Sequence, residues 1–378
     1  MSLSKKIFII SSSLLALLLL LWGIYYLSFN KSGNITAQKE TGIQPALQDK
    51  TTGEKIRLLT QEPVLGPTFV QENHSVRYYS RENGKTYQIV SDGTDKKTLS
   101  DKELPGLISV LWSPNKTKVI SKFSRENGQP QYFYYDFSAD KGTPLKNNLD
   151  FVIWQNNNKI FYKYYDSASH ERSLNIANPD GTDWKKITDI AFKDISIAPV
   201  PQSGLVSFWT KPDAYSETSL QSVSVAGQNS KTLFAGKFGA DYLWNNDGTK
   251  VLLSHSDVQS GMKIRLAVIN GQGGEYKNLE IPTFATKAVW SKDNKTIYYA
   301  LPGSMPDGVI LPNDYYAGKF KTIDTFWKVD VETGKKERVV ELDKINGQFD
   351  ATELFLNYDE SMLFFINKTD GKLYRLDL

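Results

Sequence analysis

Four aspartates occupy matching places in the sequence, each directly before a short apolar run: Asp150 before FVIW, Asp194 before ISI, Asp241 before YLW and Asp350 before ATELF. Carboxylates that gather at one place attract a hard cation or a basic segment of a partner. Aspartate also suits the turn that leads into a strand, which is a purely structural explanation. Both explanations stay open, and the first makes these four residues a candidate acidic binding site.

The residue types that most often carry catalysis are scarce in this chain. There is no cysteine, and the three histidines, His74, His170 and His255, lack the H-x-x-x-H or H-x-E spacing of a metal site. No G-x-S-x-G elbow for a serine nucleophile occurs. We expect His170 and His255 to lie on surface loops and His74 to lie in a polar turn. The sequence therefore predicts no catalytic residue, no metal site, no cofactor and no enzymatic activity.

The charge balance argues against a nucleic-acid partner. Lysine and arginine number 45 and aspartate and glutamate 42, which leaves a net charge of +3 in 378 residues. Proteins that bind DNA or RNA gather basic residues into a patch or stripe. The even scatter of charge predicts that the protein does not bind nucleic acid.

One long segment, LPGSMPDGVILPNDYYAGKFKTID at 301–324, interrupts an otherwise regular sequence. A long insertion on a rigid frame usually either carries function or is mobile. Aromatic and methionine side chains are enriched at protein interfaces. The candidate partner-binding residues in this segment are Met305, Ile310, Tyr315, Tyr316 and Phe320. The alternative is that the segment folds down over its own unit or plugs the mouth of a channel.

The elements that would position these residues repeat along the chain. LWSPNKTKVI at 111–120 returns as VIWQNNNKIFYK at 152–163, YLWNNDGTKVLL at 242–253 and AVWSKDNKTIYY at 288–299. Each copy is a strand that ends in tryptophan, a polar turn and a second strand, which is a hairpin pattern. A second hairpin follows, marked by SDGTDKKTLS at 91–100 and NPDGTDWKKITD at 178–189.

The spacing of the repeats predicts the fold class. The anchoring aromatic recurs about every 45 residues, and four strands in such a unit indicate a β-propeller blade. DISIAPVPQSGLVSFWT at 194–210 is a unit whose first strand lacks the terminal tryptophan, and the last unit, 352–378, brings the count to seven. We expect each innermost strand to place its terminal aromatic in the wedge between neighbouring blades. The starts of these strands surround one mouth of the central channel, so the four aspartates are candidates for a ring of acids at that mouth.

The last unit contains only three strands, so its outermost strand must come from elsewhere. EKIRLLTQ at 54–61 has the character of the outer-strand segments KKITDI at 185–190 and ERVVEL at 337–342. We therefore expect a strand at 55–60 to complete the seventh blade and close the ring. Otherwise this segment is the end of a linker.

The W-S-P-N/D-x-x-K turn and the D-G-T-x-x-K-x-L/I hairpin resemble the WD40-like repeat of TolB-type β-propellers, a repeat that also occurs in propeller domains of prolyl-oligopeptidase-type peptidases. The resemblance covers nearly all of 55–378. It implies protein partners that dock at one face or in the central funnel. The count and spacing of the repeats predict the fold class, an all-β, seven-bladed propeller of four-stranded blades. This chain departs from the family in its N-terminal anchor, in lacking a small domain before the propeller and in its degenerate fourth unit.

The N-terminal segment predicts a membrane anchor. IFIISSSLLALLLLLWGIYYLSF at 7–29 carries no charge and follows Lys5 and Lys6. About 23 residues at 1.5 Å each span the hydrocarbon core as a helix, and the leading lysines favour a cytoplasmic N-terminus at 1–6. The alternative is a signal peptide cleaved near Ile35-Thr36-Ala37. Residues 30–54 have the composition of a flexible linker.

These observations together predict a single-pass protein of the cell membrane whose propeller, 55–378, lies outside the cytoplasm. The expected function is that of a protein-binding or scaffold module in the cell envelope, with an envelope protein as partner. The alternative is a carbohydrate-binding or enzymatic propeller that uses the channel mouth.

Overall fold

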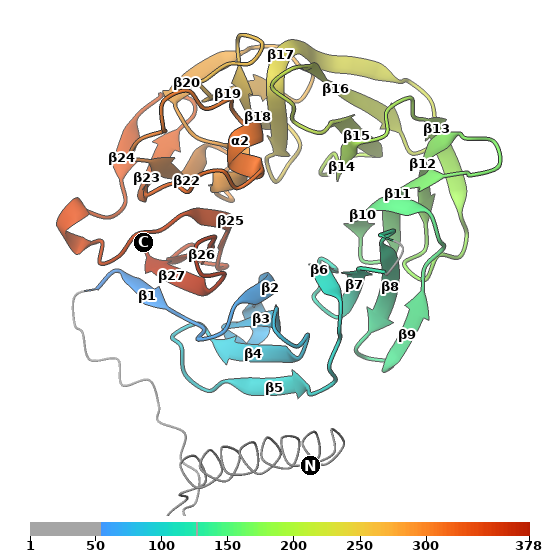
Figure 1. The fold of residues 1–378 in the computed structure, drawn as a ribbon, viewed down its shortest axis with the longest axis horizontal. Helices are drawn as coiled ribbons and strands as arrows, with labels where there is room; N and C mark the ends of the chain where they lie inside the picture. The colour runs from blue at the N-terminus through green and yellow to red at the C-terminus, as the bar shows by residue number, and fades with distance from the viewer. Residues whose placement is uncertain (1–53, 126–127) are drawn as a thin grey trace, which may run out of the picture. The chain divides into compact units, whose positions relative to one another are not determined.

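The computed structural model describes residues 54–125 and 128–378, which form a ring of antiparallel sheets around a central axis (Figure 1). Five sheets have four strands and one has seven. The prediction of an all-β propeller is confirmed. The predicted cytoplasmic N-terminus, transmembrane helix and linker, up to residue 53, lie outside the described residues.

The first three blades are continuous in sequence. Blade 1 has β2 (Val64–Val70), β3 (Ser75–Ser80), β4 (Thr86–Val90) and β5 (Lys97–Ser100), with η1 (Gln71–Asn73) between its first two strands. Blade 2 has β6 (Leu107–Trp112), β7 (Lys118–Phe123), β8 (Gln131–Asp136) and β9 (Lys141–Pro144). Blade 3 has β10 (Leu149–Asn156), β11 (Lys159–Tyr165), β12 (Arg172–Ala177) and β13 (Lys185–Asp189). Each blade follows the predicted two-hairpin order, from the innermost strand outward.

Blades 4 and 5 share one strand. Blade 4 has β14 (Ile195–Pro199), β15 (Leu205–Thr210), β16 (Glu217–Ser224) and the first part of β17 (Lys231–Trp244). Blade 5 has the rest of β17, then β18 (Lys250–Ser256), β19 (Arg265–Asn270) and β20 (Lys277–Ile281). The strand bends at Gly239, where φ is +59° and an added Cβ would lie 2.4 Å from Pro312 Cδ. Glycine suits both the positive φ and the close approach.

The last two blades complete the ring. Blade 6 has β21 (Ala288–Trp290), β22 (Thr296–Pro302), β23 (Asp324–Asp330) and β24 (Lys336–Arg338), with η2 (Ala285–Lys287) before it, η3 (Leu342–Lys344) after it and α2 (Asn313–Tyr316) in the insertion. Blade 7 has β25 (Ala351–Leu356), β26 (Met362–Asn367) and β27 (Leu373–Asp377). Counting the shared strand twice, the ring has seven blades.

The N-terminal strand closes the ring as predicted. β1 (Ile56–Leu58) pairs antiparallel with β27, with Ile56 opposite Leu376 and Leu58 opposite Tyr374. The sheet order β1-β27-β26-β25 makes β1 the outermost strand of blade 7. The last strand of the chain therefore has no exposed edge, which removes a template for unwanted strand pairing.

The hydrophobic core is divided among the interfaces between blades. Seven clusters of buried side chains each join residues of two neighbouring blades. An eighth cluster lies beneath the insertion and contains Ile264, Phe284, Leu311 and Tyr315. Apolar burial, which is the main favourable term in folding, therefore depends on blade-to-blade contact.

The repeated tryptophans lie in the wedges between blades, as predicted. The indole N–H of Trp112 donates to Gly66 O at 2.8 Å, that of Trp154 to Leu111 O at 2.8 Å, that of Trp244 to Ser207 Oγ at 2.9 Å and that of Trp290 to Leu243 O at 3.2 Å. Each bond reaches the preceding blade. The repeated sequence therefore supplies both the packing and a polar link at each of these blade interfaces.

The two faces of the ring carry different connections between strands. The loop face carries the connections between the second and third strands of the blades, including the insertion. The turn face carries the turns at 113–117, 245–249, 291–295 and 357–361. The N–H of Asp377 donates to Lys55 O, and that of Leu378 donates to Ser361 O, both at 2.9 Å. The N-terminal strand therefore begins at the turn face.

None of the helices within 54–125 and 128–378 has the length and apolar character needed to cross a bilayer.

A candidate docking platform on the loop face

Three loops of blades 4, 5 and 6 are hydrogen-bonded into one surface. They are residues 211–216 between β15 and β16, 257–264 between β18 and β19, and the insertion, 303–323. Asn313 donates to Asp213 Oδ1 and accepts from the backbone N–H of Ala214, both at 2.8 Å. The N–H of Ser260 donates to Ala214 O at 2.8 Å. We call these three loops the platform.

The insertion folds down onto blades 5 and 6. The N–H of Leu311 donates to Gly261 O at 2.9 Å, and the ring of Tyr315 stacks on Phe284 with centroids 4.4 Å apart. Leu311 and Tyr315 are buried. The segment that sequence analysis singled out is therefore part of the folded body, as one of its two interpretations expected.

The five candidate residues of the insertion have different environments. Tyr315 is buried, so its side chain positions the segment and is not available to a partner. Met305 and Phe320 are half-buried against the cluster under the insertion. Ile310 is also half-buried, and Tyr316 is 40% exposed. Tyr316 therefore has the most accessible side chain of the five.

The platform exposes apolar side chains that sequence analysis did not select. Tyr215 is 51% exposed, Val258 61%, Met262 59% and Ile323 54%. They come from all three loops. Single exposed apolar residues are ordinary on protein surfaces, whereas several on one fixed surface indicate an interaction site.

A groove of about 570 Å³ lies within the platform, between the 257–264 loop and the first half of the insertion. Met262 and Met305 line it, together with Pro306 and Leu311. Lys263, Arg265, Glu280 and Asp307 also contribute to its lining. The groove therefore offers flexible apolar contacts with both signs of charge nearby.

A buried cation lies where blades 6 and 7 meet beneath the insertion. Lys287 Nζ is 2.6 Å from Asp324 Oδ2 and 2.7 Å from Asp350 Oδ1, and all three side chains are fully buried. It also donates to Thr322 Oγ1 at 3.0 Å and to Ala351 O at 2.9 Å. A buried charge requires such compensation.

The same network holds the insertion in place. The hydroxyl of Tyr315 donates to Asp350 Oδ1 at 2.6 Å. Lys368 Nζ donates to Tyr315 O at 3.0 Å and lies 3.8 Å from the centre of the Tyr315 ring. Asp350, predicted as one of four acids at the channel mouth, therefore links blades 6 and 7 to the insertion.

The two buried carboxyls respond differently to this environment. Burial raises the pKa of Asp324, and within the described residues its Oδ1 has no hydrogen-bond partner. Burial also acts to raise the pKa of Asp350, but Lys287 and the hydrogen bonds from Tyr315 and Thr322 outweigh it and hold that pKa below its usual value. Asp324 is therefore the member of the pair that accepts a proton more readily.

Asp241 also makes contacts across blades. Its Oδ1 accepts the indole N–H of Trp209, from blade 4, at 3.0 Å and the N–H of Tyr242 at 3.1 Å. Burial raises the pKa of Asp241, opposed by these bonds and by a hydrogen bond from Tyr316. The influence of Tyr316 on this pKa places the Tyr316 hydroxyl of the insertion beside Asp241 of blade 5.

Asp150 and Asp194 are more accessible. Asp150 pairs with the buried Lys163 at 2.8 Å, and its side chain is 41% exposed. Asp194 lies 3.9 Å from Lys211, and both side chains are 62% exposed.

Each of the four predicted acids therefore has a separate set of contacts. The described residues contain no group of three or more acidic, histidine or cysteine side chains able to hold a metal ion.

The histidines have structural contacts. His170 is exposed, and its Nδ1 lies 2.8 Å from the hydroxyl of Tyr165. The expectation that His255 lies on a surface loop is wrong, because it belongs to β18 and is fully buried. Its Nε2 lies 2.8 Å from the hydroxyl of Tyr276. Burial lowers the pKa of His255 to about 4.

Several residues that contribute to this region carry little signal in the sequence. Lys287 precedes a blade in the way the four acids do, which is the one signal that marked its place. Asn313 and Asp213 are 100 positions apart and meet only in the fold. Val258 and Met262 occupy a loop of ordinary length, so nothing in the sequence distinguished them.

Comparison with known proteins places the chain by fold alone. No family model matches it. No curated protein matches it in sequence. The structure of oligogalacturonate lyase in complex with manganese is 13% identical over 88% of this chain and 95% of that one, with a TM-score of 0.63. The β-propeller domain of the trilobed protease from Pyrococcus furiosus is 11% identical over 83% and 93%, with a TM-score of 0.54.

The predicted resemblance to TolB-type propellers is also found among solved structures. TolB from Acinetobacter baumannii is 14% identical over 72% of this chain and 62% of that one, with a TM-score of 0.46, which is too loose to carry an argument. The fold and its neighbours define the class as a β-propeller. Lyases, proteases and TolB share this architecture, and a fold of this kind supports many functions.

Proposed function

We propose that this protein is a membrane-anchored β-propeller that binds an envelope protein through the platform on its loop face. The observation that carries the proposal is the bonding of three loops from three blades into one surface that exposes Tyr215, Val258, Met262 and Ile323. An ordered apolar surface loses little conformational entropy when it binds, because its loops are already fixed. Aromatic and methionine side chains on such a surface are suited to be binding hot spots.

The proposed anchor is the uncharged segment 7–29, with residues 1–6 in the cytoplasm and the propeller outside it. The strand that follows the linker enters the ring at the turn face. The platform lies at the opposite face, which leaves it free for a partner. A protein anchored this way stays in the membrane pellet after alkaline carbonate washing, and external protease digests the propeller in intact cells. Release by carbonate, or protection from external protease, would contradict the anchor or its orientation.

The proposed role is binding and scaffolding without catalysis. The carboxylate of Asp241 is hydrogen-bonded to Trp209, and that of Asp350 is paired with Lys287. His255 is buried and neutral near pH 7, because burial lowers its pKa to about 4. These groups act as structural contacts, which supports a binding role for the loop face.

The experiment is cross-linking mass spectrometry on native membranes. It compares the wild type with the double variant Val258→Asp, Met262→Asp and with the control Tyr358→Asp. Tyr358 is 58% exposed and lies on the turn face. The proposal predicts cross-links from the platform to one envelope protein that disappear in the double variant and persist in the control. Equal cross-links in all three proteins would overturn it.

A further inference from the structure

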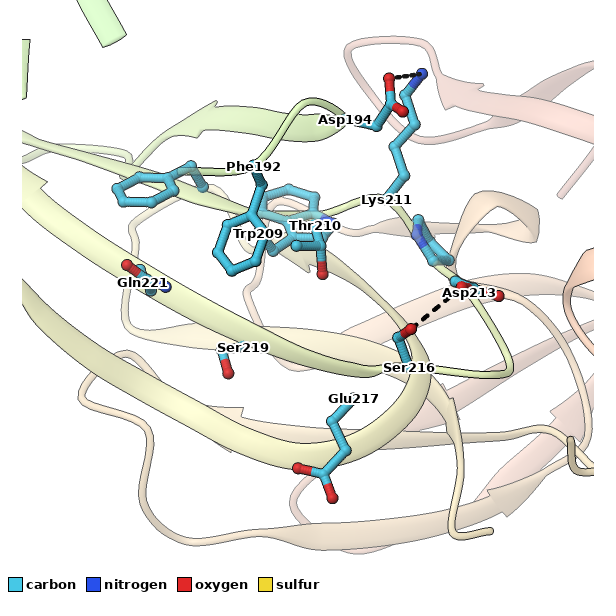
Figure 2. Close-up of a pocket in the computed structure, with 12 residues that line it drawn as sticks. Phe192, Asp194, Trp209, Thr210, Lys211, Asp213, Ser216, Glu217, Ser219 and Gln221 are labelled. Atoms are coloured by element: carbon cyan, nitrogen blue, oxygen red, sulfur yellow. Dashed lines mark hydrogen bonds and ion pairs between the residues drawn. The ribbon is translucent and has the colours of Figure 1, made fainter. Parts of the chain in front are cut away.

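A second opening lies in blade 4, beside the platform, where two neighbouring strands part (Figure 2). β15 and β16 pair only as far as Phe208 and Gln221. Beyond that point β15 stays paired to β14 up to Thr210, and β16 stays paired to β17 down to Glu217. The wedge between them is a pocket of about 500 Å³.

Polar side chains from alternate positions of β16 line this wedge. Glu217, Ser219 and Gln221 recur at every second residue of β16, so they share one face of the strand. Figure 2 shows these three along β16, with Thr210 on β15 across the opening. In the part of the chain that the structure describes, none of these four side chains makes a hydrogen bond. Ser219, Gln221 and Thr210 are half-buried and line the pocket, so their unpaired donors and acceptors are available to a ligand there.

An aromatic ring stands at the rim of the same pocket. Phe192, in the connection between β13 and β14, is 49% exposed and lines the pocket together with Trp209. The face of a phenyl ring carries negative charge density and attracts positively polarised C–H groups. An exposed ring above a row of hydroxyl, amide and carboxylate groups suits a ligand with one apolar face and many hydroxyls. A pyranose ring has these two properties.

The charges around the pocket narrow the class of ligand. Asp194, Asp213 and Glu217 line it against a single cation, Lys211. Lys211 lies 3.9 Å from Asp194, which further offsets its charge. The excess of carboxylates disfavours a ligand that carries carboxylates of its own.

The shape of the opening argues against a peptide strand. Peptides that add to a sheet need a free edge along several residues, with regular backbone pairing. Here β15 offers only Trp209 and Thr210 beyond its last pair with β16, and the other edge of β16 is occupied by β17. The hydroxyl groups of a ligand, which both donate and accept hydrogen bonds, can bind within such a short opening because they need no regular backbone pairing.

We propose that the pocket formed by Phe192, Thr210, Ser219 and Gln221 binds an oligosaccharide without carboxylates. The Phe192 ring stacks on one sugar, while the three polar side chains bond its hydroxyls. The pocket shares the 211–216 loop with the platform, but the four proposed contact residues lie outside the three platform loops.

Titration of the full-length protein with sugar hexamers tests this proposal. The probes are cellohexaose and N-acetylchitohexaose, with hexagalacturonate as the carboxylated comparison, and binding is followed by calorimetry. We expect at least one of the two neutral hexamers to bind, and hexagalacturonate to bind more weakly. Phe192→Ala and Gln221→Ala are expected to weaken binding by about tenfold each, through loss of the stacked ring and of an amide hydrogen bond. The control Phe133→Ala removes a phenyl ring that is 37% exposed on blade 2 and should bind as the wild type does.

A nearly isosteric variant guards against misfolding. Thr210→Val removes only the hydroxyl, and its near-ultraviolet circular dichroism should match the wild type while its affinity falls. Absence of binding to both neutral hexamers overturns the proposal. So does tighter binding of hexagalacturonate, or equal affinity of the wild type and the folded pocket variants.

Discussion

Lys287 of blade 6 and Asp350 of blade 7 form an ion pair of 2.7 Å in which both side chains are fully buried. Asp324 completes the cluster at 2.6 Å from the same nitrogen. Removing one partner of a buried pair leaves an uncompensated charge in the protein interior. This contact therefore determines much of the stability at the junction of blade 6, blade 7 and the insertion.

Lys287→Met should lower the free energy of unfolding by about 3–5 kcal/mol, measured by urea denaturation. Adding Asp350→Asn should recover part of the loss, because the remaining carboxyl, Asp324, has a raised pKa and can take up a proton. The control Lys335→Met removes a lysine whose side chain is 72% exposed and should leave the free energy of unfolding close to that of the wild type. Similar losses in Lys287→Met and Lys335→Met would refute the assignment.

The tryptophan wedges give a second prediction. Trp154→Phe removes the indole N–H that donates to Leu111 O at 2.8 Å and leaves space between blades 2 and 3. We expect the free energy of unfolding to fall by about 1–3 kcal/mol, since a partly buried carbonyl loses its donor. Trp184→Phe serves as the control, because Trp184 is 39% exposed. Equal stability of the two variants in thermal unfolding would show that the wedge bond contributes little.

The buried His255 predicts a dependence of stability on pH. The native pKa is about 4, whereas an unfolded histidine titrates near 6.5. As pH falls from 6.5 to 4, the unfolded chain gains a proton that the native state does not, so stability decreases. Lys237 and Arg265 reinforce the depressed pKa, while Asp257 opposes it. The loss at His255 is at most about 3 kcal/mol.

Unfolding measured between pH 7 and pH 4 isolates this contribution. His255→Gln should show a shallower fall in stability than the wild type, and His170→Gln, which changes an exposed histidine, should follow the wild type. If His255→Gln keeps the full slope, His255 does not retain its neutral form in the native protein.

The platform depends on Asn313, which bonds both Asp213 and Ala214 at 2.8 Å. Asn313→Ala should loosen the insertion, and hydrogen exchange at 303–323 should become about tenfold faster, because local opening costs less. Asn178→Ala is the matched control, since its side chain bonds Thr182 within its own turn. Unchanged exchange in Asn313→Ala would mean that apolar packing alone fixes the insertion.

Much of the fold was predictable because the repeat is local in sequence. The strand-turn-strand pattern around Trp112, Trp154, Trp244 and Trp290 lies within a dozen residues each time, so a reader of the sequence sees each hairpin whole. The place of β1 was predictable for another reason: blade 7 lacked a strand, and the segment before blade 1 resembled an outer strand. The pairing of Ile56 with Leu376 confirms this inference.

The candidate site was less predictable because its contacts join distant residues. The sequence predicts Asp350 as one acid of a ring at the channel mouth, but its place beside Lys287 depends on two blades meeting. The sequence also predicts Tyr315 as a contact residue, yet Phe284 lies beneath it and Tyr315 is buried. The unbroken path of β17 through two blades depends on a bend at Gly239, which no repeat in the sequence marks.

The most direct test of the platform as a docking surface is site-specific photo-cross-linking in native membranes. A photoreactive phenylalanine analogue replaces Val258, which is 61% exposed on the platform, or Tyr358, which is 58% exposed on the turn face. We expect one discrete cross-linked envelope protein from position 258, absent from position 358 and lost when Asn313→Ala loosens the platform. The same adducts from both positions, or none from position 258, would show that the platform is not the docking surface.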